Sequence, residues 1–211
     1  GERWVRGRCG TRNRLRLLAP TEGMSAYDPT CGSGGMLIIT REHIEQSGGD
    51  PTNLRLCGQV NGASVWSICK LNMLLHGVRG ADIQLEDTLL HPMHRDAGEL
   101  ERFDRVIANP PFSQNYTKTN MEFKERFRWG WCLTTGKKGD LMFAQHMLAV
   151  CKDKGMVCTV MPHGVLFDIG DYEQRTYGVL ESCPLTSSSD KPILTPPARL
   201  GKKLPTKKHT M

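Results

Sequence analysis

A short apolar run in the middle of the chain is followed by two prolines, in the stretch FDRVIANPPFS. Residues 103–108 have the composition and length of one buried strand of a parallel sheet. Pro110 and Pro111 cannot continue a sheet, because proline has no N–H group to donate to a neighbouring strand. The strand must therefore end at Asn109, which leaves a rigid loop at its carboxyl end. In open α/β sheets this is the edge where ligands bind.

The rest of the chain alternates between strand-like and helix-like segments. Short apolar runs predict strands at residues 24–29, 54–60, 81–87, 103–108 and 156–167. Helical periodicity predicts helices at residues 35–46, 61–77 and 138–155. The last helix has Asp140 near its start and Lys152 and Lys154 near its end, as the helix dipole favours. This alternation predicts an α/β fold with a doubly wound, mainly parallel sheet in the strand order 3-2-1-4-5.

Composition divides the chain into a core and two basic ends. Residues 1–22 form a basic segment, residues 23–183 the core, and residues 184–211 a basic, Pro- and Ser-rich tail that we expect to be disordered. Basic ends can hold phosphates without sequence preference, but they can equally be solvated tails. The eight cysteines lack paired spacing, which predicts reduced, mostly buried thiols in a cytoplasmic protein. No apolar run is long enough for a membrane span, and no signal peptide is visible.

A glycine-rich turn, DPTCGSGG, follows the first predicted strand. Glycines let the backbone approach a ligand closely, and the next helix begins there. The turn is neither G-x-G-x-x-G nor a Walker loop, so it does not indicate a pyrophosphate. Asp28 at the strand end suits the ammonium group of an amino acid-like cofactor such as S-adenosylmethionine, which has no phosphate. The alternative is a turn with no ligand.

The residues after the fourth predicted strand suit an exocyclic amine. Asn109 offers a side-chain carbonyl and Pro110 a backbone carbonyl, so together they can accept both hydrogens of an amine. These hydrogen bonds aim the nitrogen lone pair outward, while Phe112 gives a flat surface on which a ring can stack. Such positioning would let a weak nucleophile attack a sulfonium methyl group in line. The alternative is a simple Pro-Pro turn.

Two further groups of residues have less specific signals. His91 and His94 in HPMH lack a third ligand nearby in the sequence, so we expect a surface loop and no metal site. Trp129 and Trp131 lie close to Arg126 and Arg128, where they could stack on bases or simply pack.

The motifs together resemble one known family, the DNA adenine-N6 methyltransferases, and within it the modification subunit of type I restriction–modification systems. The resemblance extends over residues 23–168 and rests on YDPTCGSGGML, GQVN, ICKLNMLLHG, EDTL, FDRVIANPPFS and FAQHMLAVCKDKGMVCTVMPHGVLF, in the family's order. It implies a Rossmann-like, S-adenosylmethionine-dependent fold that methylates the N6 amine of adenine in DNA. Implied partners are DNA and the specificity and restriction subunits, and the specificity subunit would read the DNA sequence.

The resemblance also implies roles for particular residues. The cofactor would be held by Asp28, Gly32, Ser33, Gly34, Gly35 and Asp87. The target adenine would be held by Asn109, Pro110, Pro111 and Phe112. Because adenine N6 is inaccessible in a stacked duplex, the base would be flipped into this pocket.

The chain departs from the family's pattern in three places. Val60 stands in GQVN where the family has an acidic residue that binds the ribose hydroxyls. The N-terminal segment lacks the family's aromatic-Thr-Pro motif, and the C-terminal residues lack the last strands of the sheet. We therefore expect a member truncated or disrupted at both ends. An inactive remnant, or a methyltransferase of a glutamine amide or an RNA amine, remain as alternatives.

Overall fold

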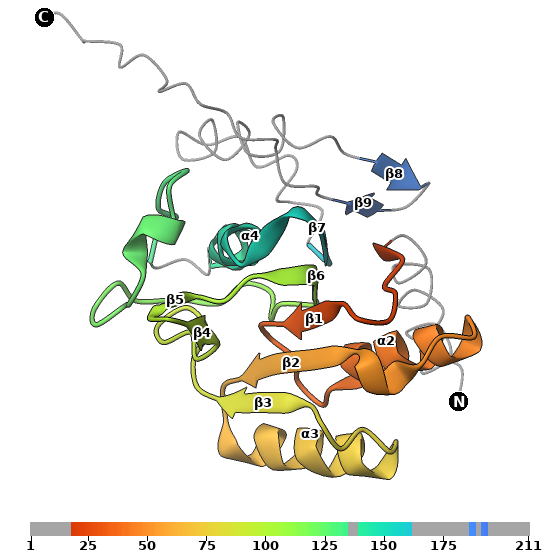
Figure 1. The fold of residues 1–211 in the computed structure, drawn as a ribbon. Coiled ribbons are helices and arrows are strands. Elements are labelled where there is room, and N and C mark those ends of the chain that lie inside the picture. The colour runs from red at the N-terminus through yellow and green to blue at the C-terminus, as the bar shows by residue number, and fades with distance from the viewer. Residues whose placement is uncertain (1–17, 135–138, 162–185, 189–190, 194–211) are drawn as a thin grey trace, which may run out of the picture.

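A five-stranded parallel sheet forms the centre of the molecule (Figure 1). The computed structural model describes residues 18–134, 139–161, 186–188 and 191–193. The strands lie in the order β3-β2-β1-β6-β7, and each neighbouring pair is parallel. This confirms the predicted fold class and strand order. The strands are β1 (Ser25–Asp28), β2 (Arg55–Val60), β3 (Asp82–Leu85), β6 (Phe103–Ala108) and β7 (Cys151–Thr159).

Helices cover both faces of this sheet (Figure 1). On one face lie α2 (Gly35–Gln46) and α3 (Ala63–Leu75), and on the other lies α4 (Asp140–Ala149). Successive side chains of a strand point to opposite faces, so β1 is buried on both sides. Ala26 packs in the cluster that contains Leu37 of α2, whereas Tyr27 packs in the cluster that contains Met147 of α4. Two short 3-10 helices, η1 (Pro51–Asn53) and η2 (Lys124–Arg126), lie in the connecting loops.

The turn before α2 requires glycine at one position. Gly34 has a left-handed φ of 80°. A Cβ atom there would lie 2.7 Å from the Cε of Met73 and 3.0 Å from the Sγ of Cys69, both on α3. A side chain at this position would therefore push the turn away from α3, in addition to the backbone strain.

Leu18 and Ala19, near the end of the basic N-terminal segment, contact the sheet. Leu18 is 1% exposed and lies in a cluster with Ile107 and Cys158. The guanidinium of Arg105 donates hydrogen bonds to the backbone carbonyls of Leu18 and Ala19. The buried charge of Arg105 thus has hydrogen-bond acceptors in the residues that lead into β1.

The last helix is shorter than predicted. It ends at Ala149, and Lys152 and Lys154 belong to β7 rather than to the end of α4. The strand begins early because Cys151 pairs with Phe103 of β6, whose N–H also donates to the carbonyl of Val150 at 2.8 Å. Sheet pairing here overrides a local charge pattern that favoured a longer helix.

Two antiparallel strand pairs were not predicted. The first joins β4 (Arg95–Asp96) to β5 (Glu99–Leu100) through Ala97 and Gly98, both with positive φ. This is the geometry of a tight hairpin turn, but Ala is unusual there, so the sequence signal is weak. The second joins β8 (Thr186–Ser188) to β9 (Lys191–Ile193) and is separate from the main sheet. The prediction that residues 184–211 hold no regular structure is therefore wrong for these six residues.

The six described cysteines are all free thiols, as predicted, and five of them are buried. Cys9 and Cys183 lie outside the described residues. Within the described ranges, no helix is both long and apolar enough to cross a membrane.

Candidate cofactor and catalytic site

A cavity of about 700 Å³ lies at the carboxyl ends of the parallel strands. It is bounded by the turn after β1, the end of β2, the loop after β3 and the loop after β6. Gly32, Val60, Asp87, Asn109 and Pro111 all line it. The fold therefore brings residues of both predicted motifs to one cavity, although the motifs are far apart in the sequence.

Asp28 lies at the end of β1, next to the cavity-lining Pro29. Its side chain is 2% exposed, and Oδ1 accepts a hydrogen bond from the backbone N–H of Thr30 at 2.9 Å. Burial raises the pKa of this carboxyl to about 7, and the hydrogen bonds from Thr30 act in the opposite direction. A carboxyl group with this pKa is partly protonated near neutral pH. A cation that approaches it would favour the charged form.

The predicted glycine turn divides into two parts. Gly32 lines the cavity, whereas Ser33, Gly34 and Gly35 are not among the lining residues. These three form the start of α2, and the carbonyl of Ser33 accepts a hydrogen bond of 2.8 Å from the Asn72 side chain. They shape the turn and the helix start rather than the cavity wall.

Asp87 holds the loop after β3 and also lines the cavity. Its Oδ1 accepts hydrogen bonds from the N–H groups of Leu89 (2.8 Å) and Leu90 (3.2 Å). Its Oδ2 accepts one from the side chain of Asn61 at 3.2 Å. Thr88 ties this loop to the first motif by donating a 2.5 Å hydrogen bond to the carbonyl of Pro29.

Arg126 is a positioning residue that sequence reasoning assigned elsewhere. Its side chain is 4% exposed and donates to the backbone carbonyls of Thr88 and Leu89, which line the cavity. Burial lowers its pKa to about 10, while nearby acidic groups and Tyr27 act against this shift. Its Nη2 donates to both carbonyls and so braces the loop after β3, whereas Nε and Nη1 are buried without a hydrogen-bond partner among the described residues.

The neighbouring tryptophans favour packing over base stacking. Trp129 packs against the cluster beneath α4, and Trp131 packs 5.0 Å from the ring of Phe127. Arg128 lies over the ring of Trp129, and Lys118 lies over the ring of Trp131.

The four residues of the predicted catalytic loop differ in exposure. Asn109 is exposed, and the structure gives its side chain no hydrogen-bond partner among the described residues. Pro110 is buried, whereas Pro111 lines the cavity. Phe112 is 44% exposed and is not among the cavity-lining residues.

The start of α4 fixes this loop through two residues that the sequence did not single out as site residues. Asp140 is 8% exposed, and its Oδ1 accepts the N–H of Ser113 at 3.1 Å. Gly139 donates its N–H to the carbonyl of Gln114 at 2.9 Å. A Cβ atom on Gly139 would lie 2.8 Å from that carbonyl oxygen, so only glycine allows this approach. No sequence motif marks this contact, because it joins an element start to a distant loop.

Comparison with known proteins places the chain in a defined family. The N-6 DNA Methylase family matches residues 11–183. The methylase subunit of the type I restriction enzyme EcoEI from Escherichia coli is 29% identical over 188 residues, which cover 84% of this chain and 36% of that protein. The MjaIX methylase subunit from Methanocaldococcus jannaschii is 34% identical over 99 residues, covering 47% of this chain and 17% of that protein.

Solved structures give the same result. A type I restriction-modification methyltransferase subunit from Streptococcus thermophilus superposes with a TM-score of 0.67 at 29% identity, covering 82% of this chain and 36% of that one. A modification subunit of a type I restriction enzyme from Vibrio vulnificus YJ016 superposes with a TM-score of 0.62 at 25% identity, covering 81% and 36%. The chain thus spans about a third of the length of these structures.

Proposed function

The chain belongs to the N-6 DNA methylase family, and from this we propose that it transfers the methyl group of S-adenosylmethionine to the N6 amine of adenine in DNA. We also propose that it works with the specificity and restriction subunits of a type I restriction–modification complex. The observation that carries the proposal is the single cavity, because Gly32 and Asp87 line it together with Asn109 and Pro111.

The cavity suits the cofactor in size and in most of its lining. Its volume of about 700 Å³ lies within the range of roughly 300–1,000 Å³ for small-molecule sites. We propose that Gly32 and Asp87 contact the cofactor from the cavity wall, that Asp28 supplies a carboxylate from the end of β1 beside the lining residue Pro29, and that Ser33, Gly34 and Gly35 shape the turn that holds it. The bound cofactor would supply a methyl group activated on a sulfonium. Val60 is the one misfit, because it lines the cavity with an apolar side chain where a ribose needs an acceptor.

We propose that the loop after β6 holds the target adenine. The side-chain carbonyl of Asn109 and the backbone carbonyl of Pro110 would accept the two amine hydrogens. Pro111 would keep the loop rigid and Phe112, which is 44% exposed, would stack on the flipped base. The contacts of Asp140 and Gly139 with this loop support the proposal, since catalytic positioning needs a loop that does not move.

Two measurements test this function in sequence. Calorimetric titration of the chain with S-adenosylmethionine should show binding to one site. Transfer of a labelled methyl group should then occur to adenine-containing DNA when the partner subunits are supplied. Transfer to RNA or to a glutamine-containing protein would replace the DNA proposal with one of those substrates. Absence of cofactor binding would identify the chain as an inactive remnant.

A further inference from the structure

Three side chains with metal-binding atoms meet on the α4 side of the sheet, outside the cavity described above. Cys57 and Asp82 are direct partners on the neighbouring strands β2 and β3, and the loop after β3 returns His94 to them. The Cys57 thiol, an Asp82 carboxylate oxygen and a His94 ring nitrogen all lie within 4.8 Å of one another. In the sequence, only His91 and His94 pointed to a possible metal site, because Cys57 and Asp82 come close to His94 only in the folded chain.

The neighbouring contacts orient two of these side chains. Gln84 donates a hydrogen bond of 2.6 Å to Oδ1 of Asp82. This leaves Oδ2 of the same carboxylate 3.4 Å from Nε2 of His94. The His94 ring is 5% exposed, packs edge-on against Tyr27 at 5.1 Å, and has no hydrogen-bond partner at Nδ1. The hydrogen bond from Gln84 to Asp82 is the kind of outer contact that holds a ligand side chain in place at known metal sites.

We propose that Cys57, Asp82 and His94 bind a divalent ion of the zinc class. Cysteine, histidine and aspartate are the ligands that zinc uses, and tetrahedral coordination needs ligand atoms about 3.3–3.8 Å apart. The Asp82–His94 separation of 3.4 Å already meets this spacing. The Cys57 thiol lies within 4.8 Å of both atoms, and a rotation of its side chain would close the remaining distance.

The charges and the access of the site also suit this ion. A thiolate and a carboxylate together neutralise two positive charges, which makes a buried divalent ion acceptable beside the apolar core. The Asp82 side chain is 44% exposed, so an ion can enter from solvent and keep a water molecule as its fourth ligand. The bound ion would fasten the loop after β3 to the sheet, since His94 belongs to that loop.

Cobalt(II) chloride is the probe for this site, because a Co²⁺–thiolate bond gives a charge-transfer band and a tetrahedral site gives strong visible bands. The full chain, purified under reducing conditions, should bind one equivalent of Co²⁺ with both signals, and zinc chloride should remove them. Cys57→Ser should abolish the charge-transfer band. His94→Gln should weaken Co²⁺ binding by more than about tenfold, since loss of an outer-shell partner alone costs about 10–100-fold.

Cys151→Ser is the matched control. Cys151 is also a buried thiol in the sheet, but it lies three strands from Cys57, or about 14 Å at ordinary strand spacing. This variant should keep both cobalt signals. A parent chain without a thiolate-to-cobalt band would overturn the proposal and leave the cluster as a histidine–aspartate hydrogen bond. Survival of the band in Cys57→Ser would overturn it as well.

Discussion

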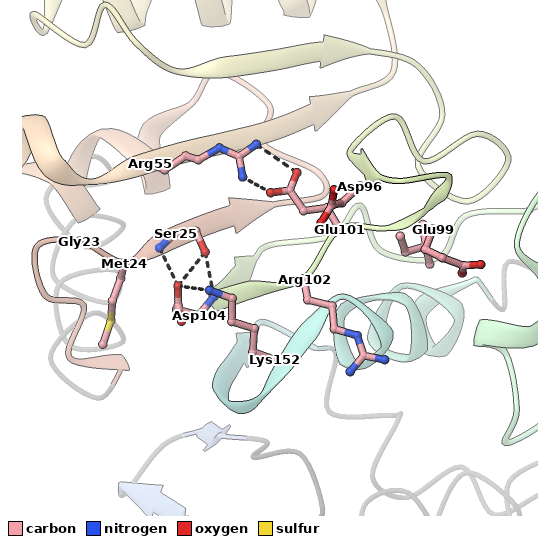
Figure 2. Close-up of a pocket in the computed structure, with 11 residues that line it drawn as sticks. Gly23, Met24, Ser25, Arg55, Asp96, Glu99, Glu101, Arg102, Asp104 and Lys152 are labelled. Atoms are coloured by element: carbon pink, nitrogen blue, oxygen red, sulfur yellow. Dashed lines mark hydrogen bonds and ion pairs between the residues drawn. The ribbon is translucent and has the colours of Figure 1, made fainter.

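The two edges of the parallel sheet carry cavities of similar size whose polar groups are used differently. The cavity at the carboxyl edge has about 700 Å³, and the one at the amino edge has about 570 Å³. The amino-edge cavity is lined mainly by charged and polar residues from the starts of the strands, as Figure 2 shows. Size alone therefore does not tell the two cavities apart.

At the amino edge, four of the charged groups that line the cavity form two pairs with one another. Asp104 accepts hydrogen bonds from Lys152 (2.8 Å) and from the hydroxyl of Ser25 (2.8 Å), and Arg55 pairs with Glu101 (Figure 2). Partial burial acts to raise the pKa of Asp104, but the bonds from Lys152 and Ser25 hold it below the usual range. The bonds of Asp104 join β1, β6 and β7, and the Arg55–Glu101 pair joins β2 to the loop before β6, so both stabilise this edge of the sheet.

At the carboxyl edge, the groups proposed for chemistry are left available. The side chain of Asn109 has no hydrogen-bond partner within the described part of the chain, and Gly32 exposes backbone to the cavity. The charged groups near it, Asp87 and Arg126, fix the loops that surround the cavity. The comparison indicates that function belongs where polar groups remain unpaired on rigid loops. Substitutions at the two edges should separate these roles.

The largest effect is expected at the carboxyl edge, from Asn109→Ala. This change removes one of the two proposed acceptors of the target amine. Loss of such a preorganised group costs about 10²–10³-fold in turnover. Methyl transfer to DNA is measured with the partner subunits supplied, and affinity for S-adenosylmethionine should change little.

Asn109→Asp is the matched control, because its carboxylate can still accept one hydrogen bond. It should retain more activity than Asn109→Ala. Full turnover in the alanine variant would contradict the proposed role of this side chain.

The next effect concerns the acceptor that the cavity lacks. Val60→Glu should tighten S-adenosylmethionine binding by about tenfold or more, since a hydrogen bond to a charged group contributes roughly 1.5–3 kcal/mol. Calorimetric titration measures this change. Val60→Leu adds volume without an acceptor and should not tighten binding. Equal affinity of the glutamate variant and the parent would show that position 60 does not face the ribose.

A smaller effect is expected from the charge of Asp28. Because burial raises its pKa to about 7, the carboxyl is neutral below that pH and cannot pair with an ammonium group. Cofactor affinity should therefore fall by about tenfold between roughly pH 8 and pH 6. Asp28→Asn should remove this dependence and bind weakly throughout. An unchanged pH profile in that variant would mean that another group causes it.

The raised pKa of Asp28 also makes the stability of the fold depend on pH, but in the opposite direction to cofactor affinity. The folded chain binds the Asp28 proton more tightly than the unfolded chain does, so this group lowers the free energy of unfolding as pH rises from about 4 to 7. Denaturant unfolding of the parent and Asp28→Asn over this range separates the two effects.

The sequence predicted those parts of the fold that local patterns determine. The apolar run at Phe103–Ala108 and the glycines around α2 fixed element bounds that the structure reproduces. The end of α4 was not predictable, because Cys151 is drawn into β7 by pairing with Phe103. Local charge patterns carry no information about such distant pairing.

The candidate site also has residues that local motifs predicted and residues that only distant contacts bring to it. The motifs predicted that Gly32 and Asn109 would come to one edge, because the carboxyl ends of parallel strands meet there. Arg126, Gly139 and Asp140 could not be found in this way, since each acts through a backbone group of a distant loop. His94 was expected in a surface loop but is buried, because its ring packs edge-on against Tyr27 and Phe103 of the sheet.

The smallest effect is expected at the amino edge, from the pair of Arg55 and Glu101. Half of the Arg55 side chain is exposed, and exposed ion pairs contribute only about 0.2–1 kcal/mol to stability. A double-mutant cycle of Arg55→Gln and Glu101→Gln, followed by urea unfolding, should give a coupling energy in this range that shrinks at high salt. Cofactor affinity and methyl transfer should stay at the parent's level in all three variants, because the charges act on each other and not on a ligand. A several-fold change in cofactor affinity would place a functional role at the amino edge and remove the distinction between the two cavities.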